Sequence, residues 1–254
     1  MARWKIIIEY DGRPFNGWQS QKDNTGIQDY VYKAIKNFSC EDVKIFTAGR
    51  TDSGVHALGQ VSHFDLNRET NSNELREALN SHLKPNPIAI LDVIEVEDNF
   101  HARFSATKRH YTYGIINRRA PLTFDKGKYW RVAKKLHIKS MIDASKYLIG
   151  HHDFTTFRSS HCQSNSPSKT IDLINIEKIN DHITFKISAK SFLHNQVRSI
   201  VGSLKLVGEG KWETKKIKEI LEKQDRTLCG PVAPAEGLCP VSYTHLTLPT
   251  SDLV

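Results

Sequence analysis

The chain has 254 residues, 39% of them hydrophobic and 25% charged, with a formal net charge of +8 and a pI of about 9.2. This size fits one large domain or two of ordinary size, and the composition favours a soluble globular protein. The apolar runs are too short for a membrane span, the N-terminus has no signal-peptide pattern, and the basic balance makes nucleic acid the first candidate partner.

The spacing of cysteines and histidines indicates the redox environment of the protein and whether it binds a metal. The chain has four cysteines: Cys40, Cys162, Cys229 and Cys239. They form no C-x-x-C pair, which favours a reducing, cytoplasmic setting. The twelve histidines are scattered, and His151-His152 has no third ligand at close spacing, so we expect no metal site. Since the sequence has no P-loop, dinucleotide-binding glycine pattern or H-E-x-x-H motif, it also predicts no cofactor.

The first hundred residues predict alternating strands and helices. Ile6–Ile8 is typical of a buried strand that ends at Tyr10-Asp11-Gly12, and Phe15 and Trp18 in the following loop are expected to pack in the core. A helix with one apolar face follows, and its buried positions are Ile27, Val31, Ala34, Ile35 and Phe38. The pattern then predicts a second helix over 73–83, capped by Asn71 or Ser72, and a strand over 88–96.

A polar loop, Thr47–Ala57, lies between these two helices and is called the Asp52 loop below. Gly49 and Gly54 indicate a tight turn between two expected strands, and Asp52 stands in the middle of it. Arg50 supplies a cation that would keep the carboxylate ionised. Because an aspartate beside a glycine is also a common turn former, the local pattern leaves both interpretations open.

Positive charge is concentrated in residues 103–146, which hold twelve Lys or Arg and two Asp, a balance of +10 that leaves about −2 for the rest of the chain. Such a block fits contacts to nucleic-acid phosphates, or a solvated basic surface without a ligand. We place the domain boundary just before the strand that begins in this block, which gives an N-terminal domain over 1–104 and a C-terminal domain over 105–254.

The second half has a similar order of elements without a sequence repeat. The pattern predicts a helix over 138–149, strands over 171–176 and 183–189 with a turn at Asn180-Asp181, a helix that ends near Gly208, and a last helix capped by Thr214. Both halves therefore predict an α+β fold class, in which each half is a mainly antiparallel sheet with helices packed on one face.

Several strings resemble one known family. G-R-T-D-S-G-V-H-A in the Asp52 loop resembles the signature of the tRNA pseudouridine synthase A family, and Y-D-G-R-P-F-N-G-W-Q resembles its opening. K-R-H-Y-T-Y from Lys108 and S-F-L-H-N-Q-V-R-S-I-V-G from Ser191 resemble two further segments in the same order. The resemblance runs to about Leu238 and implies the pseudouridine synthase fold, in which the two halves face each other across a basic cleft.

The resemblance also implies a function. The chain would isomerise uridine to pseudouridine in the anticodon stem-loop of tRNA, at positions 38 to 40, as a cytoplasmic homodimer without a cofactor. Asp52 corresponds to the catalytic carboxylate, Tyr111 to a tyrosine that would hold the uracil and relay a proton, and Arg198 to the charged partner of the aspartate. Arg50 is expected to touch RNA near the flipped base, with pairing to Asp52 as the alternative. A non-catalytic tRNA-binding protein of the same fold, or a hydrolase that releases the free base, would be the competing functions.

Two stretches depart from the family pattern. Asn195 and Gln196 differ from the usual residues there, which bears on the lining of the pocket. After Leu238 the family pattern continues as an apolar strand, whereas residues 239–254 resemble translated sequencing-adapter sequence. We expect these residues to be a non-native tail and one sheet strand to be missing or improvised.

Overall fold

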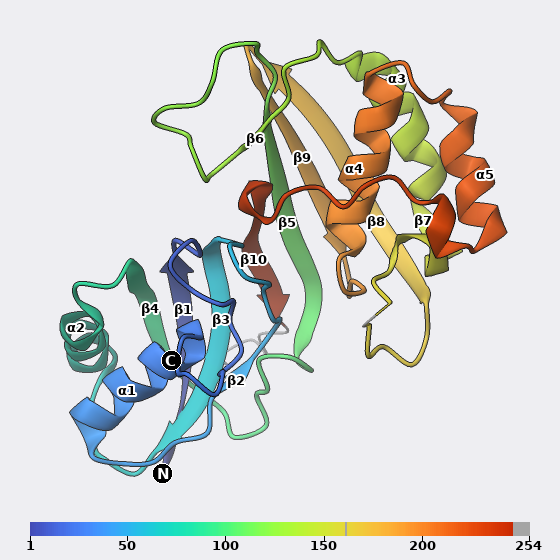
Figure 1. Cartoon of the computed structure of the whole chain (residues 1–254). Helices are drawn as coiled ribbons and strands as arrows, with labels where there is room; N and C mark the ends of the chain where they lie inside the picture. Colours follow the sequence, from blue (N-terminus) through green and yellow to red (C-terminus); the bar gives the residue numbers. More distant parts are fainter. Residues whose placement is uncertain (161, 246–254) are drawn as a thin grey trace, which may run out of the picture. The chain divides into compact units, whose positions relative to one another are not determined.

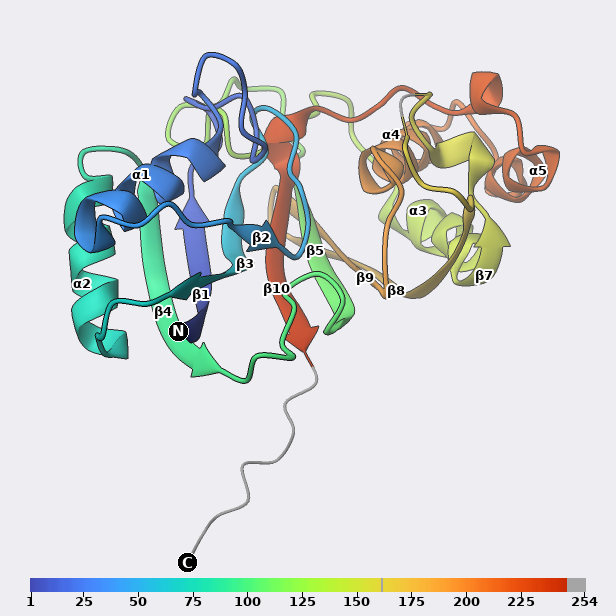
Figure 2. The same cartoon turned by 90° about the horizontal axis from the view of Figure 1, so that it is seen from below.

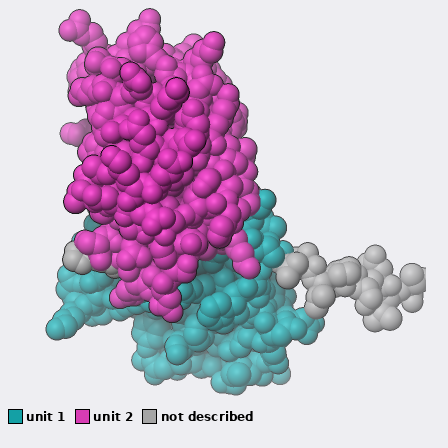
Figure 3. All heavy atoms as spheres, turned by 90° about the vertical axis from the view of Figure 1, so that its right-hand side faces the viewer, with its two compact units in different colours: residues 1–109, 240–254 teal, residues 110–239 magenta. Residues whose placement is uncertain are grey.

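Two β-sheets organise the chain, which the computed structural model describes over residues 1–160 and 162–245 (Figures 1 and 2). Two compact units result: unit 1 comprises residues 1–109 and 240–254, and unit 2 comprises residues 110–239 (Figure 3). None of the helices in the described part of the chain has the length and hydrophobicity needed to cross a bilayer.

The first sheet lies in unit 1. Its strands follow the order β2-β3-β1-β4, and β1 pairs antiparallel with both β3 and β4. The elements up to residue 96, in chain order, are β1 (Ala2–Tyr10), α1 (Ile27–Ser39), β2 (Phe46–Thr47), β3 (Ala57–Leu66), α2 (Ser72–Leu83) and β4 (Ile88–Val96). The predicted helices and the predicted strand over 88–96 are all present.

Alternation along β1 gives this sheet two covered faces. Trp4, Ile6 and Ile8 point to one face and are almost fully buried in a core shared with α1 and α2. Ile7 points to the other face and packs against a smaller cluster formed by Ala48, Val61, Phe100, Ala102 and Tyr243. Phe15 and Trp18 are buried in the helix-side core, as the sequence predicts.

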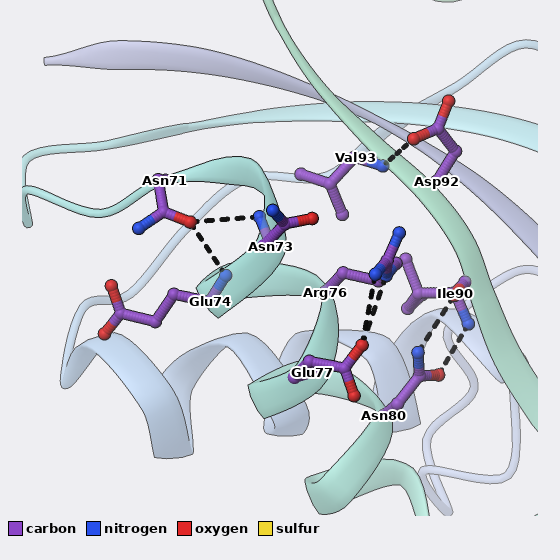
Figure 4. A network of polar contacts seen from close by, with 9 residues as sticks. All are labelled: Asn71, Asn73, Glu74, Arg76, Glu77, Asn80, Ile90, Asp92 and Val93. Atoms are coloured by element: carbon purple, nitrogen blue, oxygen red, sulfur yellow. Dashed lines mark hydrogen bonds and ion pairs between the residues drawn. The ribbon is translucent and has the colours of Figure 1, made fainter.

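Asparagine side chains fix both ends of α2 (Figure 4). Asn71 caps the helix, because its Oδ1 accepts hydrogen bonds from the backbone N–H groups of Asn73 at 3.1 Å and Glu74 at 3.0 Å. Asn80 clamps the helix to β4: its Nδ2 donates to the Ile90 carbonyl at 2.9 Å, and its Oδ1 accepts from the Ile90 N–H at 2.8 Å. The predicted cap at Asn71 is confirmed.

The second sheet has the order β10-β5-β9-β8-β7, and the short β6 pairs parallel with β5. Its strands and the helices that accompany it are β5 (Ala106–Ile116), β6 (Trp130–Arg131), α3 (Ile138–Ser145), β7 (Gly150–Asp153), β8 (Ser168–Ile179), β9 (His182–Ala189), α4 (Gln196–Gly208), α5 (Lys215–Lys223) and β10 (Leu238–His245). Short 3₁₀ turns lie at Lys146–Leu148, Thr155–Phe157, Arg226–Leu228 and Ala235–Gly237. Side chains from α3, α4 and α5 pack with those of β8 and β9 in one core, so the predicted α+β class with mainly antiparallel sheets is confirmed.

Three details differ from the sequence analysis. The helix expected over 138–149 ends at Ser145, and the chain continues as a 3₁₀ turn over Lys146–Leu148. Thr214 precedes α5 but makes no capping hydrogen bond, because its backbone is already helical at φ −56° and ψ −39°. We expected one sheet strand to be missing or improvised after Leu238. The structure has a strand there, β10, which includes residues 239–245. Pro240 is tolerated there because β10 is an edge strand of its sheet. Residues 246–254 of the expected non-native tail lie outside the described residues.

Candidate active site

The Asp52 loop of unit 1 is fastened to the chain segment that leaves β1. Thr51, the residue before Asp52, is buried, and its Oγ1 shares a 2.8 Å hydrogen bond with the hydroxyl of buried Tyr10. The Thr51 carbonyl accepts from the backbone N–H of Trp18 at 3.0 Å. The hydroxyl and the carbonyl group of Thr51 are therefore both hydrogen-bonded to the N-terminal segment, which fixes the backbone next to the carboxylate.

Two glycines allow this close backbone approach. A Cβ on Gly12 would lie 2.0 Å from the Val55 carbonyl oxygen, and one on Gly17 would lie 2.6 Å from the Thr51 carbonyl oxygen. Gly17 also has φ +83°, a backbone conformation that favours glycine. A side chain at either position would separate the N-terminal segment from the Asp52 loop.

The turn around Asp52 is closed from within. The Val55 N–H donates to the Asp52 carbonyl at 3.1 Å, Gly54 has φ +77°, and the Ser53 hydroxyl donates to the Phe15 carbonyl at 3.2 Å. Thr51 and Val55 are buried on either side, whereas Asp52 is half-buried. The loop therefore has anchored ends and keeps the Asp52 carboxylate partly accessible. Arg50 in the same loop is exposed.

An ionic cluster completes the attachment. His56 Nδ1 accepts from the Gly12 N–H at 3.2 Å and lies 3.2 Å from Asp11 Oδ1. Burial opposes ionisation of Asp11, but side-chain and backbone hydrogen bonds from Arg13 outweigh it and lower the pKa of this carboxyl group. Tyr10, Asp11 and His56 were not predicted as site residues, although all three belong to the strings that carry the family resemblance.

Arg198 lies on α4 in unit 2 and is half-buried. Its Nε donates to the Ala233 carbonyl at 2.7 Å and its Nη1 donates to Asn195 Oδ1 at 3.0 Å, so the guanidinium plane is oriented by two acceptors. The Ala233 N–H in turn donates to the Arg198 carbonyl at 3.1 Å. Gly202 lets the same chain segment approach α4, because a Cβ there would lie 1.7 Å from the Pro231 carbonyl oxygen.

The two positions that depart from the family pattern support the start of this helix. Asn195 adopts φ +63° immediately before α4, a conformation that asparagine tolerates better than most residues. Gln196 is fully buried, and its Oε1 accepts from the Leu193 N–H at 2.8 Å. Asn195 therefore orients Arg198, whereas Gln196 organises the turn that precedes it.

Tyr111 lies on β5, is half-buried, and meets Phe192 edge to face with ring centroids 5.1 Å apart. Tyr113 points to the same side of the strand but is fully buried. Its hydroxyl donates to the Pro234 carbonyl at 2.8 Å, and burial raises its pKa although the charge of Arg198 opposes this shift. Of the two phenols, only the ring of Tyr111 is partly accessible for contact with a substrate.

The predicted site residues thus fall into two groups. Asp52 and Arg50 share one loop of unit 1. Tyr111 and Arg198 lie in unit 2, where Tyr111 contacts Phe192 and Arg198 contacts Asn195. In the described part of the chain, no three His, Cys, Asp or Glu side chains gather in a way that could hold a metal ion.

Comparison with known proteins decides the family. The family model described as tRNA pseudouridine synthase matches residues 6–105 and 144–244. The chain belongs to the tRNA pseudouridine synthase family. Asp52 lies in the first matched range and Arg198 in the second, while Tyr111 lies between the two.

Curated relatives agree with this assignment. The proteins named tRNA pseudouridine synthase A from Parvibaculum lavamentivorans and Maricaulis maris are 53% and 51% identical to this chain. Each alignment covers 94% of this chain, and the two alignments cover 97% and 96% of the respective relatives. The one from Xanthobacter autotrophicus is 51% identical over 96% of this chain and 100% of that protein. Among solved structures, a chain of a Cbf5-Nop10-Gar1 complex aligns with 80% of this chain at 11% identity and a TM-score of 0.34, and the alignment covers 53% of that chain.

The predicted membership of the tRNA pseudouridine synthase family is therefore confirmed. The prediction that the chain is an enzyme, an isomerase of the pseudouridine synthase class, is confirmed with it.

Proposed function

We propose that the chain converts uridine to pseudouridine in the anticodon stem-loop of tRNA, at positions 38 to 40, with the carboxylate of Asp52 and without a cofactor. The observation that carries this proposal is the double attachment of the Asp52 loop, through Tyr10–Thr51 and through the Gly12–Val55 contact, within a range that matches the family. Catalytic groups are commonly held on loops that a rigid scaffold positions.

The reaction balances without any other reactant. The bond from uracil N1 to ribose C1′ breaks, the base turns, and C5 bonds to C1′, while the proton leaves C5 and N1 gains one. Nothing is oxidised and no group is lost. A carboxylate at Asp52 would attack or stabilise the electron-poor carbon atom during this exchange.

Arg198 is proposed as the cation that pairs with the Asp52 carboxylate and keeps it ionised. Its two neutral acceptors, Ala233 and Asn195, set the direction of the guanidinium. Tyr111 is proposed to stack on the flipped uracil and to relay a proton, which its half-buried ring allows. Arg50, exposed beside Asp52, is proposed to contact RNA near the flipped base.

Two further points concern the partner. The names of the relatives contain tRNA, which supports tRNA as the partner. The net charge of +10 in residues 103–146 supplies the positive charge that contacts to phosphates need. The family resemblance extends the proposal to a homodimer that works in the cytoplasm.

The test is to map pseudouridine in tRNA after incubation with purified wild-type and variant proteins. Asp52→Asn should remove turnover and leave the tRNA dissociation constant within about threefold, because phosphate contacts supply most of the affinity. Asp42→Asn is the matched control, since the Asp42 side chain is 72% exposed and pairs with Lys36 at the surface. Arg198→Lys should lower turnover because a lysine loses the oriented fork of donors.

Retained turnover in Asp52→Asn would remove the proposed role of this carboxylate. Release of free uracil instead of pseudouridine would indicate a hydrolase. Pseudouridine at positions other than 38 to 40 would refute the proposed target but not the isomerase chemistry.

A further inference from the structure

An exposed aromatic surface on unit 1 has no part in the reaction described above. Phe104 is 76% exposed, and its ring lies against His101 with centroids 4.4 Å apart and planes tilted by 38°. His101 in turn meets Phe46 at 5.2 Å. These three rings, Phe104, His101 and Phe46, are called the Phe104 platform below.

The platform rests on a rigid base. Buried His63 stacks on Phe46 with centroids 5.0 Å apart and planes 16° apart, and the two residues are paired across β2 and β3. His63 Nδ1 also accepts from the backbone N–H of Ala102 at 3.1 Å. The turn that carries Phe104 is closed by two bonds between His101 and Ser105, at 2.9 and 2.8 Å. A ring held in this way loses little conformational entropy when it binds a partner.

Cations accompany the rings. The Arg103 guanidinium lies 5.7 Å from the Phe104 centroid, and the Lys44 ammonium lies 5.0 Å from the Phe46 centroid. Glu97 and Asp98 are exposed on the turn before, so the surrounding charge is mixed, but the cations lie on the rings themselves. An exposed ring with adjoining cations is the combination that holds unpaired bases by stacking and the neighbouring phosphates by charge.

Besides the chain connection from Phe46 to Thr47, the Arg109 side chain links this platform to the Asp52 loop. Arg109 Nη2 donates to the Ala48 carbonyl at 3.2 Å and to the Arg103 carbonyl at 3.1 Å. Ala48 belongs to the Asp52 loop, and Arg103 immediately precedes Phe104. The platform and the Asp52 loop are therefore joined within the same unit.

We propose that the Phe104 platform stacks an unpaired base of the RNA substrate, a base other than the uridine that is isomerised. This inference rests on the proposed function, because it takes tRNA as the partner. It assigns the platform to binding and not to chemistry. Loss of the ring at 104 should raise KM and the RNA dissociation constant on the order of 10- to 100-fold, the range of one stacked base, and leave kcat unchanged.

The experiment uses three variants: Phe104→Ala, Phe104→Tyr and Ile179→Ala. For each variant, turnover is measured, and binding is measured with two RNAs: an anticodon stem-loop and a fully paired duplex of the same length. Ile179 is the control, since it is an apolar side chain that is 71% exposed at the β8–β9 hairpin. We expect the loss with Phe104→Ala on the stem-loop RNA only, recovery with Phe104→Tyr, and no change with Ile179→Ala.

Three results would overturn the inference. Unchanged binding in Phe104→Ala would show that the ring carries no base, and an equal loss on duplex RNA would indicate a contact that does not require unpaired bases. A change of oligomeric state in Phe104→Ala at unchanged stem-loop affinity would indicate that a second copy covers the ring. Failure of the proposed function is distinguishable, because the wild-type protein would then form no pseudouridine while the binding comparison remained readable.

Discussion

Gly12→Ala tests whether the N-terminal segment positions Asp52. Gly12 does not have a positive φ, so an alanine backbone is allowed there, and the effect of the substitution is steric. The added Cβ would lie 2.0 Å from the Val55 carbonyl oxygen, and real Cβ atoms essentially never come closer than 3.0 Å to such an atom. The two backbones must therefore separate by about 1 Å.

This displacement reaches the carboxylate through one hydrogen bond. The Val55 N–H donates to the Asp52 carbonyl, so a shift of Val55 moves Asp52. A misplacement of about 1 Å at a reacting group costs on the order of 100-fold in rate, or about 2.7 kcal/mol of barrier. We expect kcat to fall by roughly that factor and KM to change little, because the proposed phosphate contacts lie elsewhere.

The assay is single-turnover formation of pseudouridine, with thermal unfolding and tRNA binding measured on the same preparation. Gly210→Ala is the control: it lies in unit 2 with nothing within 4 Å of the added Cβ, and its φ of +71° makes it a destabilising glycine substitution as well. A Gly12→Ala protein that is folded and keeps its rate within about threefold would refute the claim that this contact positions Asp52.

Two further substitutions test neighbouring features of unit 1. Tyr10→Phe removes the buried hydrogen bond to Thr51, so it should lower the free energy of unfolding by about 1–3 kcal/mol and also lower kcat. Tyr32→Phe is the control, because it loses a hydrogen bond to Asp42 at the surface and should change neither quantity. Urea unfolding measures the first quantity and a turnover assay measures the second. Burial, with the charges of His101 and Arg3, lowers the pKa of His63 to about 4 from 6.5, so the unfolded chain binds a proton between pH 6.5 and 4 that the folded chain does not. The free energy of unfolding should therefore be highest above pH 6.5 and fall by roughly 3 kcal/mol towards pH 4, and His63→Asn, which keeps an acceptor for Ala102, should flatten this part of the profile in urea titrations.

Local patterns predicted most of the elements because periodicity and capping depend on near neighbours. The apolar stripe from Ile27 to Phe38 and the cap at Asn71 are examples, and both are present. Thr214 shows the limit of such patterns. A threonine before a helix favours a cap, but the cap also requires an extended backbone at that residue, and here the backbone is helical.

The candidate site was predictable only in part. The glycines around Asp52 indicate a tight loop, and the family resemblance identifies the carboxylate. The bond between Tyr10 and Thr51 and the contact between Gly12 and Val55 join residues about forty positions apart. No spacing rule relates such pairs, because the pairing of β1 with β3 brings them together.

The attachment of the Asp52 loop also explains why the residues of this loop have mostly polar and small side chains. A loop that packed through large apolar side chains would bury the carboxylate with them, and burial raises the pKa of an unpaired acid. Here the N-terminal segment supplies the anchoring, through Tyr10, Trp18 and the glycines that let two backbones touch. The position of Asp52 can therefore be fixed while the carboxylate stays partly accessible. Substitutions in the N-terminal segment should therefore lower turnover, and those that remove a buried contact, such as Tyr10→Phe, should lower stability as well.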